Sequence, residues 1–498
     1  MSIGLNVTFL DSLIEGWPAT VIDGAGIVSL GGSGEVVFRD YQLQNASIDM
    51  ATVRRILPGI DLQGLLYGTG RLDGPWLQLS FDGDIRHVAV PPLETRANGN
   101  IQFDARGDTL GVFADLFFDS LNLDGLRSSY PDLGIGGSFR GTTRVYGYAD
   151  KGAHELDMRV ARLNLERLAE GLPRTDLFGR VVGSGVSDSP KGPRANANAI
   201  FRISSVQGVV LDSVLLNLVI EDSTLRLDTL DSQGRSVHAS GAGEIGLWNS
   251  RRGTLEVRVE TDSIGAIEGI LEALLGSVED VEEREPSGSL VANLRIDGAI
   301  SDFELTGQVR GSGVSRVPVY MSDVQADGRW KWPQGDVDIG ITIDSVELAG
   351  LGFTRVVLQA HGGTDSLSWL GRSRFGRQSN EQWIARGELR STNEQYTVPV
   401  SLLGFQLASG SWHARQPLIL HASGDGIDFS EAIIASDVGG GSIVVNGRLP
   451  FRGEAGLTAS LVKLPVSDLW ALLQRNYDAV EGEVGGTFSL GGTVEYPT

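Results

Sequence analysis

Side chains that could bind a metal or perform catalysis are scattered along this chain. The six histidines lie far apart, and none belongs to a His-Glu-x-x-His motif, which would place two zinc ligands on one face of a helix. There is no cysteine, so thiolate metal sites, cysteine nucleophiles and disulfides are excluded. We therefore expect no metal centre and no cofactor.

Motifs for nucleophilic catalysis and phosphate binding are missing as well. No Gly-x-Ser-x-Gly elbow occurs, and no glycine is followed by lysine, as a phosphate-binding loop requires. The acidic run from Glu279 to Glu285 is explained by a solvated loop, with an ion site as the minor alternative. These features predict a protein that is not an enzyme.

One aromatic pair stands out from this background. Trp330 and Trp332 flank Lys331 and stand just before Pro333. We interpret the pair as side chains that pack on a strand at the edge of a sheet, with a ligand platform as the alternative.

Composition narrows the class of protein further. The chain has 498 residues, of which 41% are hydrophobic, so it can bury a sizeable apolar surface. Its 67 glycines occur without a collagen-like triplet, which is typical of many short strands joined by turns. The net charge of −22 argues against nucleic acid as a partner, because a basic face is needed to neutralise phosphates.

The element that organises the sequence is a glycine module, in which two glycines ten positions apart frame a strand. Between these glycines the even offsets are apolar or small, which predicts a strand with one buried face. The glycines themselves indicate tight turns or bulges. The modules lie near 64–74, 137–147, 179–189, 288–298 and 482–492, with the closing glycine lost in the third and the chain ending inside the last.

A short amphipathic helix is expected before four of these modules. Each expected helix has apolar residues three and four apart, and a polar residue near its start that could cap it: Asp49, Asn164, Ser263 or Ser467. A weaker version precedes the module at 137 and covers Leu121 to Tyr130. The four stronger helices are expected over 48–57, 163–171, 263–276 and 466–474.

Alternating strands dominate the remainder. Leu216, Leu218 and Ile220 should pair with a strand that contains Leu225 and Leu227, across a turn at 221–223. The commonest explanation of such strands is a closed sandwich core. Two observations favour one extended sheet instead: the helices are too few to cover so many strands, and the modules recur at irregular intervals.

This order of elements resembles the AsmA-like superfamily and, within it, the TamB-type translocation and assembly proteins of Gram-negative envelopes. The resemblance rests on the glycine modules, on the helices that lead into them, and on two glycine-containing segments, 239–243 and 445–449, expected to be turns. It implies a mainly β fold, an elongated repetitive antiparallel sheet curled into a U-shaped trough, continuous over 1–498 and carrying a few short helices. It also implies an inner-membrane anchor and a C-terminal region that this chain lacks, so we expect a fragment.

The function implied is a periplasmic one: transport of phospholipid between inner and outer membranes, or assistance in outer-membrane protein assembly. The expected partners are phospholipid acyl chains and, through the missing C-terminal region, an outer-membrane assembly barrel protein. The alternative is a surface or secreted β-repeat protein of adhesin-like type with closed cores. The residues expected to line the lipid groove are Leu255, Val257, Val259, Leu290, Leu294, Ile296, Phe303, Leu305, Val337, Ile339, Ile341 and Ile343.

Overall fold

The structure of the chain is a computed structural model in which strands make up 77% and helices 5% of the residues. The expectation of a mainly β, repetitive antiparallel fold is confirmed. The structure describes all residues except 1, 17, 31–34, 57–61, 108, 132, 149–150, 168–172, 188–193, 248–251, 268–269, 271–285, 317–318, 349–350, 364–365, 376–380, 393–394, 424–425, 451–455, 475–480 and 492–498.

The chain divides into two compact units. Unit 1 comprises Met1–Arg251 with Gly269–Gly276, and unit 2 comprises Arg252–Glu268 with Ser277–Thr498. The strands of unit 1 are β1 (Ser2–Leu10), β2 (Ala19–Leu30), β3 (Val36–Asp49), β4 (Leu65–Pro75), β5 (Ser80–Val90), β6 (Leu93–Asp104), β7 (Gly111–Asn122), β8 (Gly136–Tyr148), β9 (Lys151–Asn164), β10 (Thr175–Val186), β11 (Arg194–Val206), β12 (Val209–Glu221), β13 (Thr224–Gly234) and β14 (Val237–Gly246).

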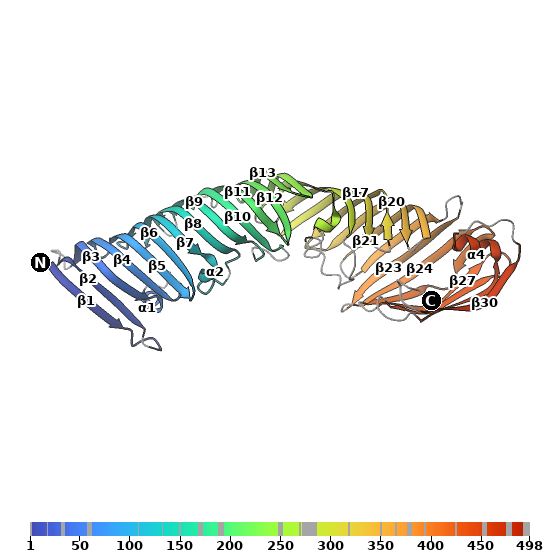
Figure 1. Ribbon diagram of the computed structural model, residues 1–498, viewed down its shortest axis with the longest axis horizontal. Helices are drawn as coiled ribbons and strands as arrows, with labels where there is room; N and C mark the ends of the chain where they lie inside the picture. Colours follow the sequence, from blue (N-terminus) through green and yellow to red (C-terminus); the bar gives the residue numbers. More distant parts are fainter. Residues whose placement is uncertain are drawn as a thin grey trace. The chain divides into compact units, whose positions relative to one another are not determined.

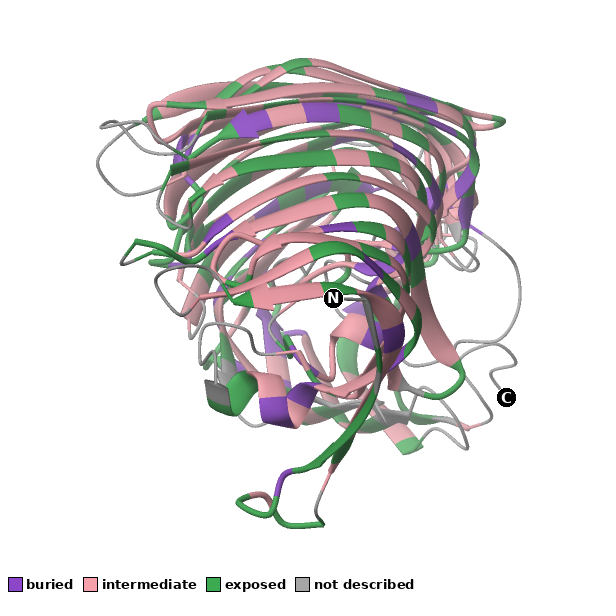
Figure 2. Cartoon of the chain, turned by 90° about the vertical axis from the view of Figure 1, so that its left-hand side faces the viewer, coloured by how far each residue is buried: buried purple, intermediate pink, exposed green. Residues whose placement is uncertain are grey.

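In unit 1 each strand pairs antiparallel with the strand that follows it in the chain (Figure 1). At about 4.8 Å per strand, these 14 strands stack over roughly 60 Å. Figure 2 looks along this stack from its N-terminal end and shows the strands bending over into an arch. The expected pairing across the turn at 221–223 is present: Leu218 lies opposite Leu227 and Ile220 opposite Leu225, whereas Leu216 lies opposite Leu230.

Unit 2 follows the same plan, with two strands broken into two pieces. β17 pairs with both β18 and β19, and β24 pairs with both β25 and β26. Its strands are β15 (Gly253–Thr261), β16 (Ser287–Ala299), β17 (Asp302–Arg316), β18 (Val319–Met321), β19 (Val324–Trp332), β20 (Asp336–Leu348), β21 (Leu351–Gly362), β22 (Ser366–Phe375), β23 (Gln382–Thr392), β24 (Gln395–Leu407), β25 (Gly410–Ala414), β26 (Leu418–Ser423), β27 (Gly426–Ser436), β28 (Ser442–Pro450), β29 (Gly456–Pro465) and β30 (Glu483–Leu490).

The glycine modules coincide with strands β4, β8, β10, β16 and β30. The framing glycines of β4, β8 and β16 and the opening glycine of β30 have positive φ, for example Gly288 at 113° and Gly298 at 141°, whereas Gly179 in β10 does not. A Cβ added to Gly298 would lie 2.4 Å from the carbonyl oxygen of Asp302, so no larger residue fits there without a shift of the backbone. The bulge expected at an opening glycine is present at Gly288, where the register of β16 with β17 shifts between Ser287 and Ser289. Residues 188–189 and 492 lie outside the described residues.

The short helices lie close to where the sequence placed them, with different boundaries. β3 runs to Asp49, whose carboxylate accepts from Ala51 N at 2.9 Å and so caps α1 (Met50–Ile56). α2 (Leu123–Leu126) follows β7 and is capped by Asn122. α4 (Val466–Leu472) starts after Pro465 without a side-chain cap, so the cap expected at Ser467 is wrong.

Two of the expected helices are described only in part. Residues 163 and 164 belong to β9, and 168–171 lie outside the described residues. In the segment 263–276, only a single 3-10 turn, η1 (Ile264–Ile267), and residue 270 are described beyond Ser263. The segments 239–243 and 445–449, expected to be turns, lie inside β14 and β28, so this expectation is wrong. Gly243 and Gly447 have positive φ within these strands, at 133° and 122°, a conformation that glycine adopts without steric cost.

Candidate functional site

The register of β15 to β20 places all twelve expected lining residues on one face of the sheet. Residues directly opposite each other on neighbouring strands project to the same side. Leu255 lies opposite Ile296, Ile296 opposite Leu305, Leu305 opposite Trp330, and Trp330 opposite Val337. We call these five residues the rim row, because they lie near the strand ends that carry the turn after Trp332.

Three further rows complete this face, which we call the apolar face of β15 to β20. The last of them, here called the base row, lies six residues along β20 from the rim row. The rows are Val257, Leu294, Gly307, Gly328 and Ile339; Val259, Ala292, Val309, Ala326 and Ile341; and, as the base row, Thr261, Leu290, Gly311, Val324 and Ile343. Phe303 stands beside the rim row, opposite Trp332.

The opposite face of the same strands is polar. Arg295 lies opposite Glu256 and forms an ion pair with it at 3.2 Å, and a second with Asp297 at 2.7 Å. The hydrogen bond from Arg295 holds the pKa of Asp297 below its usual value. The polar face of β15 to β20 is therefore hydrophilic, whereas the apolar face is hydrophobic.

The apolar face is only half-buried, and its burial changes from row to row. No residue of the rim row is buried, and Ile339 in the next row is 37% exposed. In the base row Thr261, Gly311 and Ile343 are buried, Ile343 to 5% exposure. The face is thus open along the rim and closed along the base.

The aromatic pair lies at the open rim. Trp330 and Trp332 project to the apolar face, with ring centroids 5.7 Å apart, and Phe303 meets Trp330 edge-on at 5.9 Å. The expectation that the two indoles pack together is confirmed. The expectation of an edge strand is wrong, because β19 pairs with β17 on one side and β20 on the other.

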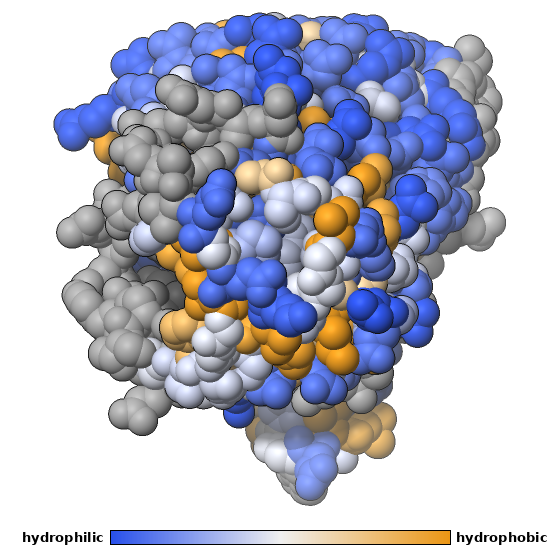
Figure 3. Space-filling view, turned by 90° about the vertical axis from the view of Figure 1, so that its right-hand side faces the viewer, coloured by the Kyte–Doolittle hydropathy of each residue, from blue (hydrophilic) through white to orange (hydrophobic). Residues whose placement is uncertain are grey.

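Farther along unit 2 the apolar side chains form closed cores. Trp412 is 1% and Leu464 0% exposed, in a cluster completed by residues of α4. The buried carboxylate of Asp468 at the start of α4 accepts from Trp412 Nε1 and from Ser409 N, each at 2.9 Å. Figure 3 looks onto this end of unit 2 and shows apolar side chains gathered in the middle of the view, with hydrophilic side chains along its upper margin.

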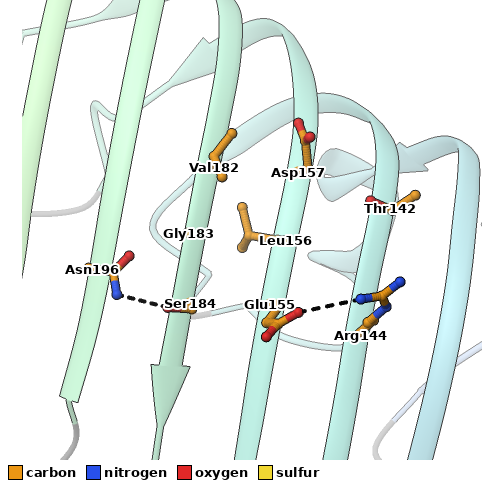
Figure 4. A pocket seen from close by; sticks show the side chains of 9 residues that line it. All are labelled: Thr142, Arg144, Glu155, Leu156, Asp157, Val182, Gly183, Ser184 and Asn196. Carbon is orange, nitrogen blue, oxygen red and sulfur yellow. Dashed lines mark hydrogen bonds and ion pairs between the residues drawn. The ribbon is translucent and has the colours of Figure 1, made fainter.

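Unit 1 offers a separate candidate on its polar face. A pocket of about 350 Å³ lies across β8 to β11, beside the pair Arg144 and Glu155, whose charged atoms are 3.8 Å apart (Figure 4). Next to it Asn196 donates to Ser184 Oγ at 2.8 Å. These groups satisfy one another, and the pocket offers no nucleophile paired with a base.

Within the described residues no three histidine, aspartate or glutamate side chains come together as a metal site would require. Among the helices that the structure describes, none combines the length and apolar character needed to cross a bilayer.

Comparison of the chain with models of protein families, with curated proteins and with solved structures finds no match of any of the three kinds.

Proposed function

We propose that this protein binds lipid acyl chains on the apolar face of β15 to β20 and conducts them along the sheet. The observation that carries the proposal is the half-exposure of a face that is aliphatic, aromatic or glycine throughout its upper three rows. Exposed apolar surface of this kind marks an interaction site, because water disfavours it by about 25 cal/mol per Å².

Apart from the indole N–H of Trp330, the side chains of these upper rows carry no polar group, which favours acyl chains as the occupant. A protein partner would bring backbone N–H and C=O groups that need hydrogen bonds, whereas a hydrocarbon chain needs none. The rows also continue from strand to strand, so that one bound chain has an equivalent position on the next strand. Such continuity suits movement along the sheet better than binding at one fixed site.

The resemblance to AsmA-like and TamB-type proteins supports the same proposal. On this proposal the protein works in the periplasm and moves phospholipid between the inner and outer membranes. A role in outer-membrane protein assembly, through an outer-membrane assembly barrel protein, belongs to the same proposal.

A β-repeat structural protein with closed cores is the second candidate. The cluster around Trp412 and Leu464 favours it, because these side chains are packed as in an ordinary protein core. The two candidates make different predictions for the apolar face of β15 to β20. A lipid conduit requires this face to be accessible, whereas a structural protein with closed cores would bury it.

The test is transfer of fluorescent phospholipid between vesicles by the purified protein. Ile341→Arg should reduce transfer strongly, because a charge facing acyl chains costs about 2 to 4 kcal/mol. Thr342→Arg, one residue along on the polar face, is the matched control and should transfer normally. Equal transfer by both variants, or none by the unaltered protein, would reject the conduit. Ile341→Arg should also stay folded, since water reaches this face.

A further inference from the structure

The aromatic cluster at the rim is not needed to explain an apolar conduit. An aliphatic rim would serve that purpose equally well, yet the chain places Trp330 and Trp332 there, with Phe303 against them. Trp332 is 44% exposed. Neither indole N–H donates a hydrogen bond to the part of the chain that the structure describes, so both stand free for another acceptor.

We propose that Trp330 and Trp332 hold the ester and glycerol region of a bound glycerophospholipid, while its acyl chains run along the strands toward the base row. This inference rests on the proposed function and assigns the lipid an orientation within it. Tryptophan suits the position because its ring is apolar and its N–H is polar, so it favours places where an apolar and a wet environment meet.

The depth of the apolar face fits this orientation. On β20 the rim row is represented by Val337 and the base row by Ile343, six residues farther on. At about 3.3 Å per residue, this separation is roughly 20 Å. The hydrocarbon of one leaflet is about 15 Å deep, half of the bilayer core. An acyl chain that starts at the indoles therefore fits within the depth of this face and ends beyond Ile341, before the buried side chain of Ile343.

The charged side chains near Trp330 and Trp332 argue against selection of lipids by the charge of their headgroup. Lys331 projects to the polar face, where it stands between Glu304 and Asp336 on the neighbouring strands. Arg252, near the same strand ends, is paired with Asp302 at 3.0 Å. Lys331 thus faces away from the indoles and Arg252 is already paired, so Trp330 and Trp332 should recognise the ester region that all glycerophospholipids share.

The orientation can be tested by mapping where a captured lipid is attached. A photo-reactive phenylalanine derivative replaces Trp332 in one form of the full chain and Ile341 in another. Each is irradiated with vesicles of equal parts phosphatidylcholine and phosphatidylglycerol, and mass spectrometry locates the bond. Position 332 should attach to the glycerol or the first carbons of the chain, and position 341 to the distal half.

Each result is decisive. Attachment of the same carbons at both positions, or capture at only one of them, would overturn the orientation while leaving lipid binding intact. Capture at neither position would reject the proposed function itself. Phosphatidylcholine and phosphatidylglycerol should be captured within about twofold of each other, and a tenfold preference for the anionic lipid would contradict recognition of the ester region.

A pair of leucine variants tests the indoles directly. With the photo-reactive residue at 341, the double change Trp330→Leu and Trp332→Leu keeps an apolar rim but removes both N–H groups. Capture should fall by about fivefold and spread over more carbons. Trp369→Leu, on the same face but partly buried against the cluster of Ala385 and Val400, is the control and should change neither. An unchanged attachment pattern in the double variant would overturn the role of the indoles.

Discussion

Ile339 and Ile343 lie four residues apart on the same face of β20, yet Ile339 is 37% exposed and Ile343 only 5%. Alternation along a strand decides which side chains share a face, but not how deeply each one is covered. The difference between these two isoleucines shows that the apolar face has an open side and a closed side.

This difference predicts unequal costs of truncation. Ile343→Ala should lower the free energy of unfolding by about 2 to 4 kcal/mol, because it removes buried methyl groups and leaves a cavity. Ile339→Ala should cost less than about 1 kcal/mol, since much of its surface is already in water. Chemical denaturation of the two variants measures both values, and equal losses would contradict the open rim.

The closing glycine of a module should tolerate no side chain. Gly298→Ala should destabilise unit 2 by about 1 to 3 kcal/mol, because its φ of 141° strains any other residue. Gly328→Ala is the matched control, since an added Cβ there meets no atom closer than 3.5 Å. Melting temperatures of the two variants provide the comparison, and a harmless Gly298→Ala would show that the glycine module is not a backbone requirement.

Asp468 should hold the start of α4 in place. Asp468→Ala leaves Trp412 Nε1 and Ser409 N without their acceptor in a buried site, and should cost about 2 to 4 kcal/mol of unfolding free energy. Denaturation followed by tryptophan fluorescence reports this loss. Asp338→Ala, at an exposed position of β20, is the control and should change stability by less than about 0.5 kcal/mol.

At the end of β6, hydrogen bonds from Arg106 lower the pKa of Asp104 to about 2. Because the folded pKa lies below the ordinary value of 3.8, the stabilisation is complete above that value and is lost as pH falls toward about 2. The melting temperature of Asp104→Asn should therefore lie below that of the unaltered protein at pH 6, and the gap should close by pH 2. A gap that persists at pH 2 would contradict the depressed pKa.

The strands and their faces could be predicted from local sequence. The twelve alternating residues from Leu255 to Ile343 were assigned to one face, and the register places them there. Asp49 was expected near the start of a helix and caps it. These features depend on residues close together in the chain, so they can be predicted from the spacing of apolar residues in the sequence.

Features set by distant contacts could not be predicted. The start of α4 depends on Asp468, whose partners Ser409 and Trp412 lie more than fifty residues away in sequence, so Ser467 was a misleading signal. The alternation of apolar and polar residues does not indicate where the register shifts, as it does between Leu43 and Ala46 in the pairing of β3 with β4. The burial of Ile343 likewise depends on how the whole sheet folds around it.

Contact of the apolar face of β15 to β20 with lipid can be measured by photo-capture at two adjacent residues of β20. A photo-reactive residue at Ile339 should capture phospholipid from vesicles. The same residue at Asp338, which projects to the opposite face, should capture none. Strong capture at 339 with none at 338 is the predicted result, and equal capture at both positions, or none at 339, would contradict the conduit.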